Sequence, residues 1–460
     1  MKFSKVEFLI IVATLTVQLL FLIIFIHFAG EQKIISNDGL EYYTLGKNLL
    51  TEGKFSLFTG DGHLMESLRT PLYPLFITLT LFILDKIWFI SLLQIMLSGF
   101  IAVIIYRLSA FFLPGRWLLL PVVLYLSNPY TWFASVLAMT EVLYTVFSLL
   151  AVYFLFRYLQ NFDWKTLAVS VFLLAASILI RPVSFYLFFG YGLFIATYLT
   201  AKFKSYRQTI GCVLIFLSAW LIFVLPWSWR NYELFGRFEI SSIQNYNLYF
   251  YNARLFYAGV NNLSKDETIL TFRNKAKDHF SPRALIVGVS YDDYRRSLLA
   301  SEYYNHEALG ILAPHIFSYA RLHLIGMVPF FTDAGWRDLL SALNVDLGQA
   351  QSLTLLLTQG KFSAIWENIT QNPFYFFVFI LGKVYYALIW VLILAAFFLV
   401  PRRQRFWILI IYFLILYFAA VSSPVANARF RYPVEPLMLI TATVAISAMV
   451  VRRSAPDPAP

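Results

Sequence analysis

The sequence predicts an all-α polytopic membrane protein with about ten transmembrane helices, surface helices on its outer face and a mainly helical extramembrane segment. Of its 460 residues, 60% are hydrophobic and 13% are charged, whereas soluble domains average about 45–50% apolar and about 25% charged residues. The mean hydropathy is +0.68. Aromatic residues make up 19% of the chain and crowd the ends of the apolar runs, as belts at membrane interfaces do.

Ten apolar runs are candidates for membrane-spanning helices, which need roughly 17 residues or more. These runs are 7–28, 87–106, 117–136, 142–157, 166–180, 183–200, 209–226, 376–400, 406–421 and 434–451. Basic clusters alternate with the spans, at Lys2/Lys5, Arg107/Arg116, Arg157/Lys165, Lys202/Lys204/Arg207, Arg402/Arg403/Arg405 and Arg452/Arg453. If these clusters face the cytoplasm, the path is consistent and both termini are cytoplasmic. The net charge of +11 therefore indicates topology, and nucleic-acid binding is set aside.

Two further apolar stretches are predicted to lie on the outer membrane surface. The stretch 71–84 is too short to cross comfortably, and counting it as a span would place Arg107 outside. The same parity makes 311–331 an interfacial helix. Lys383 lies well inside the apolar run 374–400, so that span is predicted to begin after the lysine.

The predicted organisation has four parts, listed in chain order. They are an N-terminal transmembrane module (1–226) that includes a first outer loop (30–86), an outer-face loop or small domain (227–375), the C-terminal transmembrane helices (376–451) and a disordered tail (452–460).

Polar residues that could do chemistry gather on the predicted outer face. Arginines there could grip a phosphate with a planar donor fork, and a carboxylate beside them could take a proton. Such a set would suit a phosphorylated lipid substrate. These residues are Asp38, Glu41, Arg69, Glu141, Arg181, Arg230, Asn231, Arg429 and Arg431.

The acidic residues of this set also admit structural roles. Asp38 and Glu41 have the spacing of an acidic capping box that would open a helix over 39–50. Glu141 directly precedes an apolar helix, whose N-terminus it could cap.

The arginines differ in how strongly they indicate function. Arg69 and Arg181 each lie just before a proline and could be anchors at the ends of spans. Arg429 and Arg431 violate the positive-inside trend, since parity places them outside. That violation favours a functional role for them.

Several segments, in their order and spacing, resemble the polytopic GT-C glycosyltransferases, in the bacterial branch related to protein mannosyltransferases and to lipid A aminoarabinose transferase. The segments are Asp38-Gly-Leu-Glu-Tyr-Tyr-Thr-Leu-Gly-Lys-Asn-Leu-Leu50 with Gly53-Lys-Phe-Ser56, Arg69-Thr-Pro-Leu-Tyr-Pro-Leu-Phe76, Ser127-Asn-Pro129 through Met139-Thr-Glu141, Ile180-Arg-Pro182, Pro226-Trp-Ser-Trp-Arg-Asn231 with Phe235-Gly236, and Arg429-Phe-Arg-Tyr-Pro-Val-Glu-Pro436.

The resemblance implies an enzyme of the bacterial inner membrane that takes a sugar from a polyprenyl-phosphate-linked donor in the bilayer. It would transfer the sugar to an acceptor on the periplasmic or extracellular face, with inversion of the anomeric carbon. It implies that Asp38 is the general base and Glu141 a second catalytic acid. The residues implied to bind substrate are Glu41, Tyr42, Arg69, Tyr73, Arg181, Arg230, Asn231, Arg429 and Arg431.

The chain departs from the protein mannosyltransferases at two motifs. Those enzymes carry Asp-Glu where this chain has Asp38-Gly39, and His-Pro-Pro where it has Arg69-Thr-Pro. There is also no room for their large lumenal carbohydrate-binding repeat. These departures favour a glycolipid or another envelope glycan as acceptor over a protein.

Two other functions stay open on the sequence. An O-antigen ligase or polymerase, which uses a lipid diphosphate donor, would suit the long segment 227–372 but would place its essential groups there. A lipid or sugar transporter would place ionisable groups near the bilayer midplane and often contains inverted repeats. Here the charges gather at one face.

No cofactor is fixed by the sequence. Two acids could share a divalent cation such as Mg²⁺ or Mn²⁺, or the arginines could do the same electrostatic work alone. The sequence contains no HExxH, paired CxxC, P-loop or GxSxG motif, which leaves no hydrolase or ATPase signature.

Overall fold

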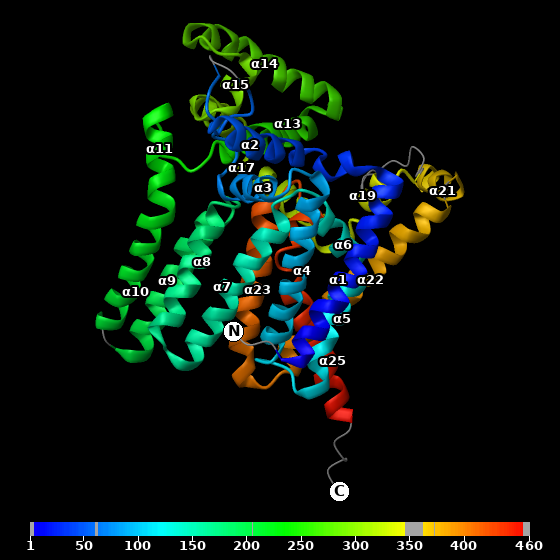
Figure 1. The fold of residues 1–460 in the computed structure, drawn as a ribbon. Coiled ribbons are helices and arrows are strands. Elements are labelled where there is room, and N and C mark those ends of the chain that lie inside the picture. The colour runs from blue at the N-terminus through cyan, green and yellow to red at the C-terminus, as the bar shows by residue number, and fades with distance from the viewer. Residues whose placement is uncertain (1–3, 60–62, 205, 346–361, 372, 454–460) are drawn as a thin grey trace, which may run out of the picture.

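The protein is a helical bundle with a helical cap at one end (Figure 1). The computed structural model describes residues 4–59, 63–204, 206–345, 362–371 and 373–453, and within these ranges every regular element is a helix. The all-α prediction is therefore confirmed. The predicted disordered tail lies outside the described residues beyond its first two positions.

Among the described residues, eight helical segments are long and apolar enough to cross a membrane, and seven of them coincide with predicted spans. The seven are α1 (Lys5–Ala29), α4 (Ile87–Ser109), α7 (Glu141–Asn161), α9 (Ser184–Phe203), the continuous run of α10 (Tyr206–Ala219), η3 (Trp220–Val224) and α11 (Leu225–Phe235), α22 (Pro373–Leu399) and α23 (Arg402–Ser422).

The eighth segment is the one predicted to lie on the surface. Leu298–Thr332 satisfies the length and composition of a span, but short 3₁₀ turns divide it. Its pieces are η5 (Leu298–Ala300), α16 (Ser301–Leu312), η6 (Ala313–His315), α17 (Ile316–Gly326) and α18 (Val328–Thr332).

Three predicted spans are not among these eight segments. The run 117–136 is broken into η2 (Gly115–Leu119), α5 (Leu120–Ser127) and α6 (Pro129–Val136). Proline disfavours helical backbone at the preceding residue, and the Asn128 side chain instead caps α6 by accepting from the Tyr130 N–H at 3.1 Å. The other two form the single helices α8 (Trp164–Ile178) and α25 (Glu435–Arg453).

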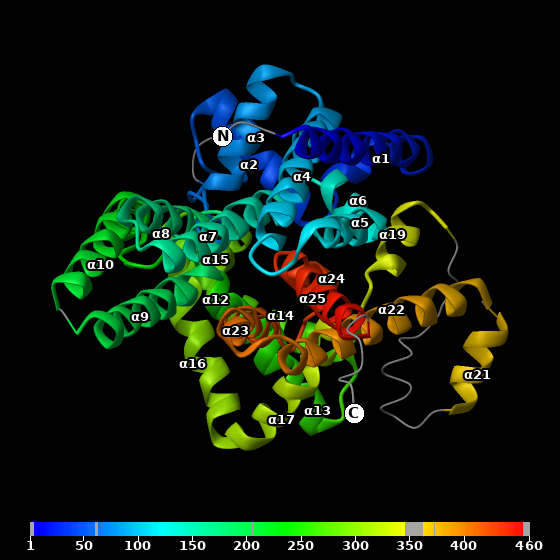
Figure 2. The same ribbon diagram turned by 90° about the horizontal axis from the view of Figure 1, so that it is seen from below.

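The bundle core is built around α4 and α7. α4 packs against α1 on one side and against α7 on the other, and α7 in turn packs against α8, as the view along the bundle shows (Figure 2). Gly99 of α4 faces Ile11 of α1, and a Cβ added there would make an ordinary contact with Ile11 at 3.7 Å.

Both chain ends lie at one end of the bundle, and the cap lies at the other (Figure 1). The cap begins with η1 (Glu31–Ile35), α2 (Asp38–Glu52) and α3 (Leu72–Ile83). α2 and α3 pack side by side, so the stretch 71–84 lies across the end of the bundle. Gly46 permits this contact, because a Cβ there would lie 2.6 Å from Ile77.

The rest of the cap has its own small core, rich in tyrosine and phenylalanine. It includes Tyr249, Phe272, Phe280 and Tyr304. The helices that build it are α12 (Ile243–Asn247), η4 (Leu248–Ala253), α13 (Arg254–Asn261), α14 (Lys265–Val287), α15 (Tyr291–Arg296) and α16. This core holds the end of α15 against α2.

The remaining described helices close the bundle beside α22. They are α19 (Trp336–Ala342), α21 (Phe362–Gln371) and the single turn α24 (Ala428–Arg431). α22 runs unbroken through Lys383, whose ammonium donates to the Thr332 hydroxyl at 2.8 Å.

Candidate active site

Asp38 begins helix α2, at a tight approach between the first outer loop and the loop before α7. The Ala138 N–H donates to the Ile34 carbonyl at 2.8 Å. A Cβ at Gly39 would lie 3.0 Å from the Ala138 carbonyl oxygen. Glycine at 39 therefore lets Asp38 come close to the start of α7, where Glu141 lies.

Both carboxylate oxygens of Asp38 are held by arginines. Arg69 Nη2 donates to Oδ1 at 2.8 Å, and Arg429 Nη1 donates to Oδ2 at 2.8 Å. Burial alone would raise the pKa of Asp38, but the two guanidinium groups outweigh burial and lower it to about 2. The Asp38 side chain is nevertheless 33% exposed, so it lies at the open edge of the site.

Glu41 lies one helical turn further along α2 and is bound by two arginines. Arg69 Nε donates to Oε2 at 2.8 Å. Arg296, at the end of α15, donates to both Glu41 oxygens at 2.9 Å each, and its Nη2 lies 3.5 Å from Glu66 Oε2. Burial raises the pKa of Glu41, but Arg296 and Arg69 reverse that effect and lower it.

Glu141 is the buried acid of the site, with only 2% of its side chain exposed. Its Oε1 accepts from Arg181 Nη1 at 3.1 Å and from Arg429 Nε. Its Oε2 is buried and has no hydrogen-bond partner among the described residues. The Arg181 guanidinium lies between the rings of Tyr144 and Phe430, 5.7 and 5.8 Å from their centroids.

These contacts join four carboxylates and four guanidinium groups into one ion-pair network. Its formal charge sums to zero, because each of the four arginines is already paired with a carboxylate. We call this set the site network. It consists of Asp38, Glu41, Glu66, Glu141, Arg69, Arg181, Arg296 and Arg429.

Two of the predicted tyrosines pack behind Arg69 of the network, Tyr42 directly and Tyr73 through Tyr42. Tyr42 lies under the Arg69 guanidinium, 5.0 Å from ring centroid to Cζ, and its hydroxyl accepts from Arg69 Nη1 at 3.3 Å. Tyr73 packs edge-on against Tyr42 and donates to Gln94 Oε1 at 2.8 Å. Tyr73 is fully buried, so its contacts position Tyr42.

Arg230 and Asn231 lie beside the network and bind backbone carbonyls. Arg230 Nη1 donates to the Glu66 carbonyl at 2.9 Å and to Asn231 Oδ1 at 2.7 Å. Asn231 Nδ2 donates to the carbonyl of Glu239 at 2.8 Å. These bonds hold the chain around Glu66 in place.

Arg431 points away from the site network, although Arg429 is only two residues earlier. Its Nη1 donates to the Phe330 carbonyl at 2.6 Å, and its Cζ lies 3.6 Å from the centre of the Tyr386 ring. Its Nε lies 3.8 Å from Glu435 Oε2. Arg431 and Glu435 are 0% and 2% exposed; we call these two residues with Tyr386 the buried arginine cluster.

Two network residues were not among the predicted site residues, Glu66 and Arg296. Glu66 lies three residues before Arg69, within a segment already identified as important, and its Oε1 accepts from the Leu68 N–H. Arg296 lies in the long segment after α11, and 255 positions separate it from Glu41. No local spacing in the sequence connects those two residues.

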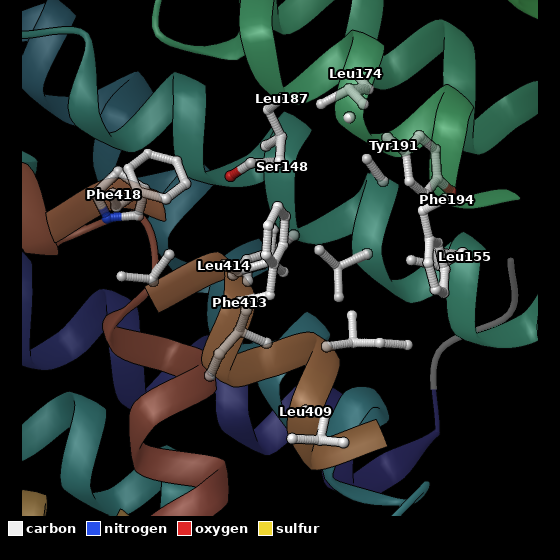
Figure 3. A pocket seen from close by; sticks show the side chains of 18 of the residues that line it. Ser148, Leu155, Leu174, Leu187, Tyr191, Phe194, Leu409, Phe413, Leu414 and Phe418 are labelled. Atoms are coloured by element: carbon white, nitrogen blue, oxygen red, sulfur yellow. The ribbon is translucent and has the colours of Figure 1, made fainter. Parts of the chain in front are cut away.

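An apolar cavity of about 690 Å³ lies inside the bundle between α7, α8, α9, α23 and α25 (Figure 3). Its lining includes Leu193 and Phe413, which are more than half exposed, so it opens sideways on the apolar surface of the bundle. Phe406 stacks on Phe194 and Tyr198 and closes the end near the chain termini.

The other end of the cavity lies on the side of the site network. Phe418 lines the cavity, and its ring centre is 6.1 Å from that of Tyr144, on which Arg181 lies. Pro433, another lining residue, follows Arg429 by four positions. The rings of Phe418 and Tyr144 therefore lie between the apolar space and Arg181 of the network.

Nothing in the described ranges forms a cluster of three or more His, Cys, Asp or Glu side chains suited to a metal ion. Arginines occupy the positions between the acids. Asp38 and Glu141, for example, are both bound by Arg429.

Comparison with known proteins gives one structural match. No protein-family model and no curated protein matches the chain. The structure is similar to the crystal structure of ArnT from Cupriavidus metallidurans bound to undecaprenyl phosphate, with a TM-score of 0.40 and 12% sequence identity. That match covers 97% of this chain and 78% of the other.

Proposed function

We propose that the protein transfers a sugar from a polyprenyl-phosphate-linked donor to an acceptor at the capped face of the bundle, with inversion at the anomeric carbon. The observation that carries this proposal is the position of the site network. A partly exposed carboxylate, Asp38, shares Arg429 with the buried Glu141, and only the rings of Phe418 and Tyr144 lie between an apolar cavity and Arg181 of the same network. An anionic head with an apolar chain fits that arrangement.

The proposed reaction needs one base and one set of cations. Asp38 takes the proton of an acceptor hydroxyl while the acceptor oxygen forms a bond to the anomeric carbon. The bond from that carbon to the phosphate oxygen breaks on the opposite face. Its electron pair leaves with the lipid phosphate, whose added negative charge Arg429 and Arg181 stabilise.

Glu141 serves this reaction by holding the two cations. It accepts from both Arg181 and Arg429 and is almost completely buried, so it fixes the spacing of the two guanidinium groups. Glu41 and Tyr42 do the same for Arg69. Arg230, Asn231 and Arg431 are proposed to hold the chain around the site through their hydrogen bonds to backbone carbonyls.

The apolar cavity is proposed to receive the first part of the donor's isoprenyl chain. It is lined almost entirely by aliphatic and aromatic side chains, and its side opening lets the rest of a long chain stay in the bilayer. Pockets of several hundred cubic ångströms bind ligands of this size.

The acceptor is proposed to be a glycolipid or another envelope glycan at the periplasmic or extracellular face of a bacterial inner membrane. The cap places Asp38 at the end of the bundle opposite the chain termini (Figure 1). The basic clusters near the termini favour a cytoplasmic location for the end of the bundle where the termini lie, which supports an outer location for the cap.

The direct test is a transfer assay with purified protein in lipid nanodiscs, using polyprenyl-phosphate-linked sugars and an envelope glycolipid fraction. We expect loss of lipid-linked sugar and a new glycosidic product detected by mass spectrometry. Asp38→Asn should lower turnover by roughly 100-fold or more, the scale of a missing general base. Asp292→Asn, an exposed acid on the same face, is the matched control. Near-parental turnover in Asp38→Asn would refute the role of Asp38.

A second test addresses the cavity. Gly190 lines it, and a Cβ built there meets nothing within 4 Å, so Gly190→Phe fills the cavity without a clash at the backbone. We expect the donor KM to rise about tenfold or more, the scale of losing one buried apolar contact. Val213→Phe, on the exposed apolar face of α10, is the control. An unchanged donor KM in Gly190→Phe would exclude the cavity as the chain site.

One observation keeps the ligase or polymerase function as a second candidate. Arg296 belongs to the long segment after α11 and binds Glu41 through two hydrogen bonds, so that segment contributes to the site. A ligase should lose activity mainly in Arg296→Ala and accept a lipid diphosphate donor. The proposed transferase should lose activity mainly in Asp38→Ala and use a lipid monophosphate donor.

A further inference from the structure

Asp38, the base of the proposed reaction, is already paired with cations in this structure. Each oxygen of Asp38 accepts a hydrogen bond from an arginine, 2.8 Å in both cases. A carboxylate held in this way by two cations binds a further proton poorly. An acceptor hydroxyl could not be deprotonated efficiently until at least one of the two arginines moves away.

The charge balance of the site network also disfavours binding of the negatively charged donor. Four carboxylates already neutralise four guanidinium groups. A phosphodiester brings one more negative charge to a network in which each guanidinium group already has a carboxylate partner. It can bind well only if it replaces a carboxylate on one of the arginines.

Arg429 is the arginine best placed for such an exchange. Its side chain is 26% exposed, whereas the side chains of the other three network arginines are 13–15% exposed. It binds Glu141 through Nε and Asp38 through Nη1. Its Nε can therefore stay on the buried Glu141 while its outer end turns from Asp38 to a phosphate.

Arg69 is locked by comparison. All three of its nitrogens are used, by Glu41, Tyr42 and Asp38, and the guanidinium lies on the Tyr42 ring. Releasing Asp38 from Arg69 would require breaking this whole arrangement. Release from Arg429 requires the loss of one hydrogen bond.

We propose that Arg429 is a donor-operated latch on Asp38: the lipid-linked phosphate takes the Nη end of Arg429 and so frees Asp38 to act as base. This inference rests on the proposed function and adds an order to it, with the donor bound before the acceptor is activated. Glu141 is the pivot that keeps Arg429 at the site in both positions.

The latch also resets the base after each turnover. Once Asp38 has taken the acceptor proton, the lipid phosphate leaves and Arg429 Nη1 returns to Asp38 Oδ2. The two guanidinium groups then outweigh burial again and return the pKa of Asp38 to about 2, so the proton passes to solvent. Without donor the carboxylate stays paired and the acceptor is not activated.

The experiment is a titration of Asp38 in the full-length protein in nanodiscs, by carbon-13 NMR of carboxyl-labelled aspartate, with Asp38→Asn to assign the signal. The probes are geranyl phosphate, inorganic phosphate and geraniol. Geranyl phosphate should raise the Asp38 midpoint by about one pH unit or more. Geraniol should leave it unchanged, and inorganic phosphate should act only at much higher concentration if the chain contributes to binding.

Two variants make the test specific to Arg429. Arg429→Gln should show a raised Asp38 midpoint without any ligand and no further rise with geranyl phosphate. Arg237→Gln removes an arginine that pairs with Glu302 outside the site network and should behave like the parent in this titration. An Arg429→Gln midpoint equal to that of the parent would overturn the latch.

The outcomes separate the latch from the proposed function. If geranyl phosphate binds saturably by phosphorus-31 NMR and the transfer assay is positive, but the Asp38 midpoint does not move, the latch is wrong and the transferase proposal stands. If no lipid phosphate binds and no sugar is transferred, the proposed function fails and the latch fails with it.

Discussion

Arg429 and Arg431 lie two residues apart on the same helical turn, yet they are in opposite environments. Arg429 joins two carboxylates at the open edge of the cap. Arg431 is fully buried and binds the backbone carbonyls of Phe330 and Asp333. The comparison teaches that an arginine on the outer face is not by itself a substrate ligand; its partners and its exposure decide.

The two arginines should therefore fail in different ways when they are replaced. Loss of Arg431 leaves Glu435 as a buried charge without its ion-pair partner. Loss of Arg429 leaves Glu141 still paired with Arg181. The first change should act on stability and the second on the reaction.

The largest effect is expected for Arg431→Met. Removing one partner of a buried ion pair costs about 3–5 kcal/mol, so the unfolding temperature of the protein in detergent should fall by several degrees. Scanning fluorimetry measures it. The double variant Arg431→Met/Glu435→Leu should recover most of the loss, since it removes both charges together. A double variant no more stable than the single one would contradict this account of the buried arginine cluster.

The next effect is expected for Arg429→Gln. Turnover should fall by about 10²–10³-fold, as it does when one donor to a developing negative charge is removed. The unfolding temperature should change little, because the exposed ion pair with Asp38 contributes at most about 1 kcal/mol. Transfer rates and scanning fluorimetry on the same sample test both parts. A large fall in stability with normal turnover per folded molecule would reverse the roles assigned to the two arginines.

A smaller effect is expected for Arg230→Gln. Arg230 holds the Glu66 carbonyl and not a carboxylate of the site network, so its loss should act through the position of Glu66 and Arg296. Turnover is expected to fall by about tenfold or less, in keeping with a lost hydrogen bond of about 1–1.5 kcal/mol. A fall as large as that of Arg429→Gln would show that Arg230 binds substrate directly.

Much of the fold and part of the site could be predicted from the sequence. Apolar length and basic clusters placed seven spans and gathered Asp38, Arg69 and Arg429 at one end, because burial in lipid and loop charge are local properties of the chain. The break at Asn128–Pro129 also has a local cause, although the run 117–136 was predicted to be continuous.

The pairings within the site could not be predicted in the same way. Arg429 and Arg431 have the same residue type and nearly the same position, and only the packing of α24 against Phe330 and Asp333 separates them. Arg296 binds Glu41 because the small core of the cap holds α15 next to α2. Such contacts depend on tertiary packing, which residue spacing does not encode.

The smallest predicted effect is a response to acid that belongs to Asp38 and the two arginines that bind it. The pKa of Asp38 is lowered to about 2 by Arg69 and Arg429 against the effect of burial. A carboxylate with a lowered folded-state pKa adds stability at neutral pH and loses it as the pH falls from about 4 through 2. After allowance for solvent screening, this is about 1 kcal/mol. The drop in unfolding temperature from pH 7 to pH 3 should therefore be smaller in Asp38→Asn than in the parent. It should keep its parental size in Arg431→Met, whose lost charge has no contact with Asp38; a reduced drop there would mean that Arg429 and Arg431 act on one titrating group after all.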